Sequence, residues 1–391
     1  MSELQEQDRS RLTDKAFLDG MRDHGDPLVA KVVEQLVNLP TTKEFGVLSL
    51  FRELTHTTET IPDTLPDFIK DYFEDTEELP EWADRDKLKR AANLFSEYGP
   101  EIVMILFCKS LPLSYSCWRG AEVLVSTGRL TSERKEDLAK FNRRIMETAQ
   151  FVLNVMAPRG FGRKGLAIRT AQKIRLIHGS IRYFLAEADW DFDTYGVPIN
   201  QEDMAGTLMS FSWVILEGLG QLGYQIDDED QEAYIHCWNV IGYFLGLSEE
   251  LLPADVEQAK SLTEAILTQQ SGPSEAGTLL TESLIEYMRE EFFFWPVKCF
   301  PAFLMRKLVG EKTANMLEIP NKACHIGALM LDIVEWIFGL LHKKENESPV
   351  LRKVFGFFTR KLLQRLVLIY NQEKQVRFVI PPSLSGQWKI G

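Results

Sequence analysis

A single histidine, His178, lies between an apolar stripe and two arginines in the segment LAIRTAQKIRLIHGSIRYFLA, residues 166–186. On a helical wheel of about 100° per residue, the isoleucines of this segment fall on one side of His178. Arg175 and Arg182 fall on the other side, within one helical turn of it. Because imidazole is a common metal ligand at neutral pH, this segment is the first candidate for chemistry.

The arrangement around His178 matches what a haem needs from a helix. The imidazole would supply an axial nitrogen to the iron, and the apolar stripe would cover the porphyrin. Arg175 and Arg182 would pair with the two propionates, which are costly to bury without a partner. Gly179, directly after the histidine, would allow a flat ring to approach closely. The sequence therefore predicts His178 as the metal ligand and both arginines as cofactor-binding residues.

Two other interpretations of this segment stay open. A lone histidine on a half-buried helix is more often a satisfied core or boundary residue, and the arginines would then form a solvated face. The segment is also strongly basic, which would suit an acidic partner or a phosphate. Together with the residues just before the segment, the cationic residues are Arg163, Lys164, Arg169, Lys173, Arg175 and Arg182.

A second unusual placement occurs on the preceding segment, residues 137–155, which also has helical periodicity. Thr148 lies within its apolar stripe, and Arg144 lies one turn earlier on nearly the same face. A hydroxyl and a guanidinium in such a stripe need partners. One explanation is local, with Thr148 bonded to the carbonyl of Arg144. The other is a polar distal pocket above a metal or cofactor.

His236, in the apolar run YIHCWNV, is the rival metal ligand, but it has no arginines nearby and core packing is its favoured role. Motifs for other chemistry are scarce. The sequence contains no GxSxG, P-loop or HExxH motif. One GxGxxG, at Gly160, Gly162 and Gly165, follows a helical pattern rather than a strand and predicts a turn between two helices. Most hydrolase, kinase and dehydrogenase functions are therefore disfavoured.

The composition is that of a folded protein with a sizeable core, since 45% of the 391 residues are hydrophobic and 26% are charged. The formal net charge of −13 argues against nucleic acid as a partner. No apolar run is long enough to span a membrane, although peripheral membrane contact stays open. The polar N-terminus predicts no secretory signal. Five cysteines without a CxxC spacing predict neither a disulfide framework nor a zinc site, and the expected location is the reducing cytoplasm.

Helical periodicity dominates the whole chain and predicts an all-α fold built as a single large helical domain. We expect an N-terminal helical wrap over residues 1–100, a catalytic region over residues 101–345, and a C-terminal helix with an extended tail over residues 346–391. The segment VPINQEDM predicts a helix start capped by Asn200, with Glu202 and Asp203 in the first turn. Residues 269–281 are the best loop candidate in the second half.

Several motifs together resemble the oxygenase MpaB family, which includes rubber oxygenases of the latex-clearing type. They are RTAQKIRLIHGSIRYF, YGVPINQEDMAGTLMSFSWVILEGL and AYIHCWNVIGYFLG, with LPLSYSCWRGAEVLVSTGRLT upstream. The resemblance covers residues 106–247 well and the flanks weakly. It implies a b-type haem in a globin-like helical core, with the family's proximal histidine at His178.

The resemblance also implies catalytic residues on the helix before His178. Relatives of the latex-clearing type carry an R-x-x-K-T pattern there, which Arg144 and Thr148 match. Glu147 stands where the pattern has lysine, and a glutamate cannot cap an iron as an amine can. This departure argues against rubber itself as the substrate. Glu147 would act as a base or, as we favour, lie on a solvated helix face.

We therefore expect a haem b-dependent oxygenase that uses O₂ and oxidises an apolar unsaturated substrate, either a small molecule or a polymer. Isoprenoid, terpenoid and unsaturated lipid chains fit this chemistry. The alternative is a non-enzymatic helical protein that binds haem or lipid as a carrier or sensor. The sequence does not predict an oligomeric state.

Overall fold

The computed structural model describes residues 11–39, 65–127, 145, 147–158, 160–162, 165–291 and 299–321. Within these ranges the regular secondary structure is helical, and the β-type pairing is limited to an isolated bridge between Cys117 and Ser271. The prediction of an all-α fold is confirmed. The predicted C-terminal helix and tail, residues 346–391, lie outside the described residues.

The helices have the following bounds along the chain. The first half contains α2 (Lys15–Met21), α3 (Pro27–Val37), α5 (Asp67–Asp75), α6 (Arg85–Ile105), the π-helix η1 (Leu106–Ser110), α7 (Leu111–Ser116), α8 (Trp118–Ser126) and α10 (Leu166–Glu187). The second half contains α11 (Phe192–Tyr195), α12 (Gln201–Phe211), α13 (Trp213–Gln221), α14 (Asp228–Leu245), the 3₁₀ helix η2 (Glu249–Leu251), α15 (Val256–Gln270), α16 (Glu275–Glu291), α17 (Phe300–Val309) and α18 (Glu311–Met316).

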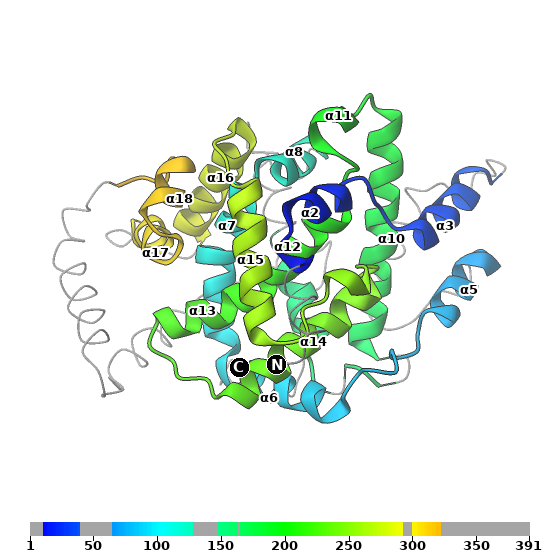
Figure 1. Cartoon of the computed structure of the whole chain (residues 1–391), viewed down its shortest axis with the longest axis horizontal. Coiled ribbons are helices and arrows are strands. Elements are labelled where there is room, and N and C mark those ends of the chain that lie inside the picture. The colour runs from blue at the N-terminus through cyan, green and yellow to red at the C-terminus, as the bar shows by residue number, and fades with distance from the viewer. Residues whose placement is uncertain are drawn as a thin grey trace.

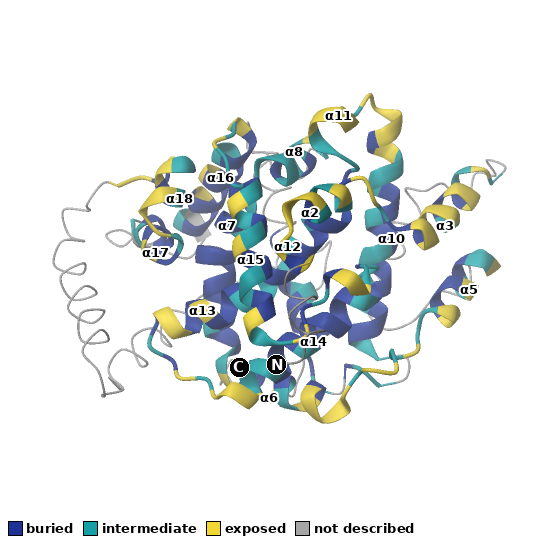
Figure 2. Ribbon diagram, viewed as in Figure 1, coloured by how far each residue is buried: buried dark blue, intermediate teal, exposed yellow. Residues whose placement is uncertain are grey.

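The centre of the molecule is formed by α14, which packs against both α6 and α10. α12 packs on α14 and α15, and α13 packs on α6. Figure 1 shows α10 as a long helix on the right, with α3 and α5 beyond it and α16, α17 and α18 gathered on the left. Buried residues concentrate on the inner helices in Figure 2, whereas α11 lies on the surface and has no buried residue.

Many helix starts are set by a side-chain cap, which satisfies backbone N–H groups that have no intrahelical partner. Asn200 accepts a hydrogen bond from the backbone N–H of Asp203 at 2.8 Å, which confirms the predicted start of α12. The same role is taken at other helices by Asp14, Asp26, Asp84, Asp191, Asp227 and Asp255.

α6 contains Pro100 and crosses the boundary predicted between residues 100 and 101, so no break in the backbone marks that boundary. The chain continues directly from α6 through η1 into α7. A π-helical turn places an extra residue in the helix and is frequent at functional sites. Leu106 and Ser110 of this turn line the cavity described below.

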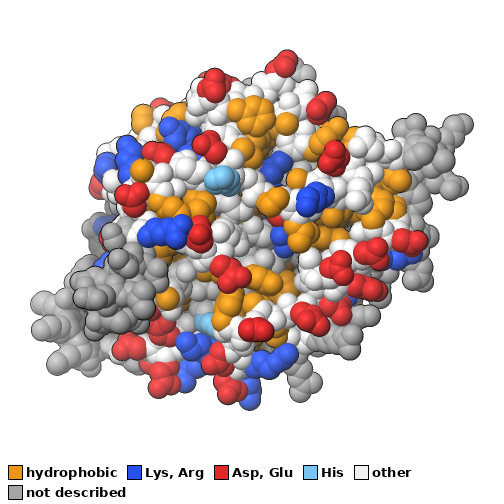
Figure 3. Space-filling model, turned by 45° about the vertical axis from the view of Figure 1, so that its right-hand side comes forward, with side chains coloured by type: hydrophobic (Ala, Val, Ile, Leu, Met, Phe, Trp, Pro, Cys, Tyr) orange, Lys and Arg blue, Asp and Glu red, His pale blue; other side chains and the backbone are white. Residues whose placement is uncertain are grey.

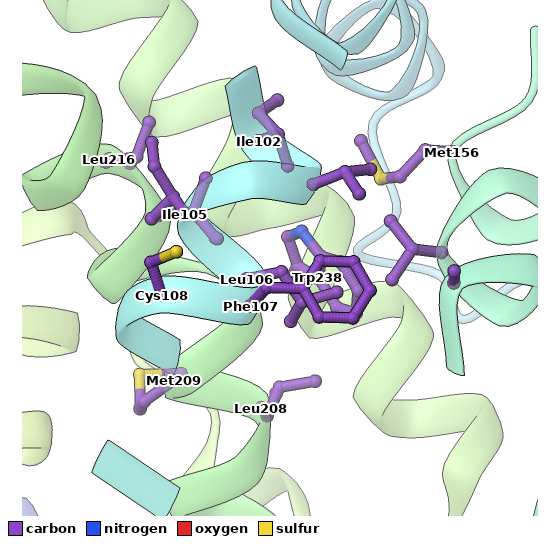
Figure 4. Close-up of a cluster of buried hydrophobic side chains, with 14 of the residues drawn as sticks. Ile102, Ile105, Leu106, Phe107, Cys108, Met156, Leu208, Met209, Leu216 and Trp238 are labelled. Carbon is purple, nitrogen blue, oxygen red and sulfur yellow. The ribbon is translucent and has the colours of Figure 1, made fainter. Parts of the chain in front are cut away.

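The main hydrophobic core lies between α6, η1, α12, α13 and α14. Figure 4 shows part of it, with Phe107 and Leu106 of the α6–η1 segment beside Trp238 of α14, and Leu208 of α12 below them. Trp238 is 1% exposed and stacks on Phe211 with ring centroids 5.1 Å apart. This core fixes one side of the cavity, because Leu106, Leu208 and Trp238 also line it.

Two sequence predictions about connections have different outcomes. The glycines at 160–165 form a turn ahead of α10, as predicted, with the N–H of Gly165 bonded to the carbonyl of Gly162. The predicted loop over residues 269–281 is wrong for most of its length. α15 continues to Gln270 and α16 begins at Glu275, so the connection between the two helices is only four residues long, 271–274.

Cys299 is disulfide-bonded, whereas Cys108, Cys117 and Cys237 are free thiols. The sequence predicted no disulfide framework and gave no sign of this single bond. Disulfides are rare in reducing compartments, so this bond weighs against the predicted cytoplasmic location, which stays a prediction. None of the described helices combines the length and the apolar character needed to cross a bilayer.

Gly179 serves a different purpose from the one predicted. A Cβ at this position would lie 2.7 Å from a methyl carbon of Val29 and within 3.3 Å of Val33, both on α3. The missing side chain therefore lets α3 approach α10 and does not open space for a flat ring. Val29 and Val33 belong to a second cluster of buried residues between α3, α5 and α10.

Gly179→Ala is expected to destabilise the protein by about 1–3 kcal/mol, because the added methyl group overpacks the contact with α3. Urea unfolding would measure this loss. Gly220→Ala is the matched control, since nothing lies within 4 Å of a Cβ there. It is expected to raise stability by up to about 1 kcal/mol through helix propensity. Equal effects in the two variants would contradict the packing argument.

Candidate functional site

A cavity of about 250 Å³ lies among α7, α8, α10, α12, α15 and the helical residues 147–155. Its lining is mainly apolar, with contributions from every one of these helices. Representative lining residues are Leu111, Leu124, Phe151, Ile174, Ile181, Leu208, Phe211 and Ile266. On the outside, hydrophobic side chains form patches between acidic and basic ones on the face in Figure 3.

His178 lines this cavity from α10 and is half-buried. Ile174 and Ile181, one turn before and after it, line the cavity with it. The helix spans Leu166–Glu187, close to the predicted segment. The imidazole thus lines a mainly apolar cavity, which would suit a ligand to haem iron.

Thr148 and Glu147 line the same cavity from the helix that precedes α10. Both are half-buried, so Glu147 differs from the solvated helix residue favoured from the sequence. Arg144, the third predicted catalytic residue, lies outside the described residues. The structure therefore brings together His178 and two of the three predicted catalytic residues, whose roles stay predictions.

Arg175 is engaged by a carboxylate of the protein. Its Nε and one Nη donate to the two oxygens of Asp26, at 2.5 and 2.9 Å. Asp26 is 3% exposed and caps α3, so this bidentate pair joins α3 to α10. Arg175 is not among the described residues that line the cavity, and its role as a cofactor ligand stays a prediction.

Arg182 differs from Arg175 because no carboxylate pairs with it in the described ranges. Its Nε and Nη2 donate to the carbonyl of Ile199 at 3.0 and 2.6 Å. Its Nη1 is buried without a hydrogen-bond partner in the described structure. Burial lowers the pKa of this guanidinium to about 10. Ile199 and Met204, both in contact with Arg182, line the cavity, so an unpaired cation lies just behind its wall.

His236 is held by contacts that suit a structural role. Its Nε2 accepts a hydrogen bond from the backbone N–H of Asp84 at 2.8 Å, and its ring meets Trp82 edge-on at 5.7 Å. Burial lowers the pKa of His236, in agreement with a neutral acceptor ring. It is not among the described residues that line the cavity. These contacts favour the packing role suggested by the sequence.

No group of three or more His, Cys, Asp or Glu side chains in the described ranges is arranged to hold a metal ion by itself. The donor chemistry at the cavity is instead one imidazole in apolar surroundings, with an unpaired buried guanidinium close by. Such a set fits a metal that arrives inside a macrocycle with its own nitrogen ligands and acidic substituents.

Comparison with known proteins assigns the chain to a family. The family described as ER-bound oxygenase mpaB/B'/Rubber oxygenase, catalytic domain, matches residues 105–333, more than half of the chain. The chain belongs to this family. The resemblance noted from sequence motifs is confirmed, and the prediction of an oxygenase is confirmed at the level of the family.

The chain is also similar to individual members of this family, in sequence and in structure. It is 26% identical over 292 residues to the rubber oxygenase of Streptomyces sp. (strain K30), a match that covers 74% of this chain and 66% of the relative, just under two thirds. A solved structure, that of latex clearing protein LCP in the closed state, superposes with a TM-score of 0.70 at 22% identity. That superposition covers 92% of this chain and 95% of the other, and it shows that the fold is shared.

Sequence reasoning missed a polar part of the cavity in this member of the family. Asp203 and Gln270 line it, and Glu202 lies directly behind them. Glu202 and Asp203 were assigned only to the first turn of α12. Their burial depends on Arg22, which donates to both carboxylates at 2.9 Å from a position far away in the chain. Ser110, Ser114 and Tyr115 of η1 and α7 also line the cavity.

Glu202 is fully buried, and desolvation raises its pKa to about 7. The folded state thus holds this proton more tightly than the unfolded chain, in which the pKa is near 4.5. The stability that this gives is fully present below about pH 4.5 and is lost as the pH rises through about 7.

As the pH rises across that range, the free energy of unfolding of Glu202→Gln is expected to increase relative to that of wild type by on the order of 3 kcal/mol. Urea unfolding of both proteins at several pH values measures it, and a difference independent of pH would contradict it.

Proposed function

We propose that this member of the family is a haem b-dependent oxygenase, with His178 as the proximal ligand and an apolar unsaturated substrate. The observation that carries the proposal is that His178 and Thr148, from two different helices, line one mainly apolar cavity. The family match supports the oxygenase reaction, and the orphaned Nη1 of Arg182 supports a cofactor that carries carboxylates.

Different residues of the chain would bind the cofactor and contact the reacting groups. The imidazole of His178 would donate a lone pair to the iron, and Arg182 would pair with a propionate. Haem, when bound, supplies the redox chemistry with O₂. Thr148 would offer a hydroxyl on the distal side, together with Arg144, which the sequence places one turn earlier. Glu147 would offer a carboxylate in place of the lysine of the rubber-oxygenase pattern.

The apolar wall would do two things for the substrate. It would bind a hydrocarbon chain by removing it from water, and it would keep water away from the reacting carbon–carbon double bond. The relatives are named for rubber and latex, so a polyisoprenoid chain is one substrate class that we propose. Isoprenoid, terpenoid and unsaturated lipid chains of lower mass share the same chemistry.

Oxygen consumption by the haem-loaded full chain tests this function. Short polyisoprene oligomers and their fully hydrogenated counterparts form a matched pair of substrates. We expect consumption of O₂ and oxygenated products, seen by mass spectrometry, only with the unsaturated oligomers or with unsaturated terpenoids and lipids. A haem-loaded protein that consumes no O₂ with any of these would instead be a carrier or sensor, and the oxygenase proposal would be wrong.

A further inference from the structure

One wall of the cavity is polar, although most of the lining is apolar. The wall is formed by α7, α12 and α15. We call it the acceptor wall and define it by Ser114, Asp203, Thr207, Ser210, Thr263 and Gln270, all of which line the cavity. This wall offers a ligand more hydrogen-bond acceptors than donors.

The hydroxyl hydrogens of the acceptor wall are already used inside the protein. A hydroxyl has one hydrogen to donate but two lone pairs with which it accepts. Thr207 donates to the carbonyl of Asp203 at 2.7 Å, and Thr263 donates to that of Ala259 at 2.7 Å. Ser210 donates to the carbonyl of Gly206 at 2.9 Å, and Ser114 bonds to Ser110 and Ser210 at 3.0 Å. What these hydroxyls still offer to a ligand is an acceptor oxygen.

Asp203 adds a carboxylate to the same wall. One oxygen accepts from Arg22 at 2.9 Å and the other accepts from Asn200 at 2.8 Å. A carboxylate oxygen accepts more than one hydrogen bond, so both retain capacity. The side chain of Asp203 is 14% exposed, and a Cβ added at Gly120 of α8 would lie 3.3 Å from its Oδ1.

Gln270 is 1% exposed, and its amide carries an unused acceptor. Its Nε2 donates to Glu202 at 2.8 Å, whereas its Oε1 has no hydrogen-bond partner within the described chain. Oε1 of Glu202 is likewise buried without a partner there. Buried acceptors without donors are costly, so this part of the molecule is suited to a donor that comes from outside the chain.

The charge of this cluster disfavours an anionic ligand. Arg22 balances Asp203, and its hydrogen bonds are directed at Asp203, Glu202 and the carbonyl of Tyr195 rather than at the cavity. Glu202 has its pKa raised to about 7, so the cluster is close to neutral or negative near neutral pH. The described residues that form the acceptor wall include no lysine or arginine, so a carboxylate or phosphate bound there would meet mainly oxygens.

We propose that the cavity takes an unsaturated hydrocarbon chain that ends in a hydroxyl group, with the hydroxyl donating to the acceptor wall beside Asp203 and Gln270. The ligand class is thus an unsaturated alcohol rather than an acid, a phosphate or a plain hydrocarbon. The inference rests on the proposed function in one respect, because it takes this cavity as the substrate site. Asp203 is the specificity-determining residue in this arrangement.

Calorimetric titration of the haem-loaded full chain with a matched set of terpenoids tests the proposal without any turnover. The set is geraniol, its methyl ether, geranic acid and the dimethyloctadiene of the same skeleton that lacks oxygen. The ether retains the oxygen but has no hydrogen to donate. We expect geraniol to bind about tenfold or more tightly than the ether and the hydrocarbon, since a hydrogen bond to a charged acceptor contributes that much. Geranic acid at alkaline pH should bind most weakly.

Two variants, titrated with the same four ligands, test the role of Asp203. Asp203→Asn removes the charge and adds donor hydrogens, so it should reduce the preference for geraniol and improve the binding of geranic acid. Leu124→Ala is the control from the apolar wall, and it should weaken all four ligands by a similar factor without changing their order. The wild-type series stands by itself if Asp203→Asn fails to fold.

The outcomes separate this inference from the proposed function. Equal affinities for geraniol, its ether and the hydrocarbon would overturn the inference and leave the apolar substrate site intact. Tighter binding of geranic acid than of geraniol would also overturn it. Absence of binding by all four ligands would overturn both the inference and the assignment of the cavity as the substrate site.

Discussion

Replacing His178 with alanine is expected to abolish haem binding and, with it, oxygen consumption. The reason is that the imidazole is the proposed iron ligand, and no cluster of other metal-ligating side chains exists in the described ranges to replace it. The measurement is the Soret band of the purified variant after addition of haem. We expect the absorbance of free haem only, while the far-ultraviolet circular dichroism stays that of a helical protein.

His236→Ala is the matched control for this loss. His236 accepts a hydrogen bond from Asp84 and packs on Trp82, so its removal should lower stability but leave the Soret band in place. Loss of the Soret band in His236→Ala with retention in His178→Ala would reverse the ligand assignment.

Arg175→Gln and Arg182→Gln are expected to have different effects, although the two arginines lie about two turns apart on the same face of α10. Arg175→Gln removes a guanidinium from the buried pair with Asp26 and leaves a carboxylate that is 3% exposed without its cation. The expected loss of unfolding free energy is about 3–5 kcal/mol. Urea unfolding of the haem-free protein measures it.

Arg182→Gln is expected to act mainly on haem affinity. It retains an amide that can donate toward the carbonyl of Ile199, but it removes the charge and the unpartnered Nη1. Loss of a charge-assisted hydrogen bond to a propionate should raise the haem dissociation constant about tenfold to hundredfold. Haem titration followed by absorbance measures this constant. An equal loss of affinity in Arg175→Gln, after correction for its stability, would show that both arginines bind the cofactor.

The sequence was sufficient to predict features that depend on local periodicity. The helix around His178, the cap at Asn200 and the glycine turn before α10 all follow from residues close together in the chain. Apolar spacing and capping chemistry are local properties, and so they can be recognised without knowledge of the fold. Thr148 was found in the same way, as a hydroxyl within an apolar stripe.

Features that depend on distant partners could not be predicted. The wheel placed Arg175 and Arg182 alike, but Asp26 on α3 pairs with only one of them. Gly179 was assigned to a flat ring because nothing local revealed that Val29 packs against it. The burial of Glu202 and Asp203 depends on Arg22, and acidic residues at a helix start are ordinarily exposed. Tertiary contacts thus decided the partner of each charged group.

The haem content of the purified wild-type chain is the most direct test of the account. A pyridine haemochrome assay after reconstitution should show the spectrum of b-type haem at close to one haem per chain, because His178 lines a mainly apolar cavity and is the proposed iron ligand. A protein that stays colourless after haem is added, while its circular dichroism shows the helical fold, would contradict the central claim.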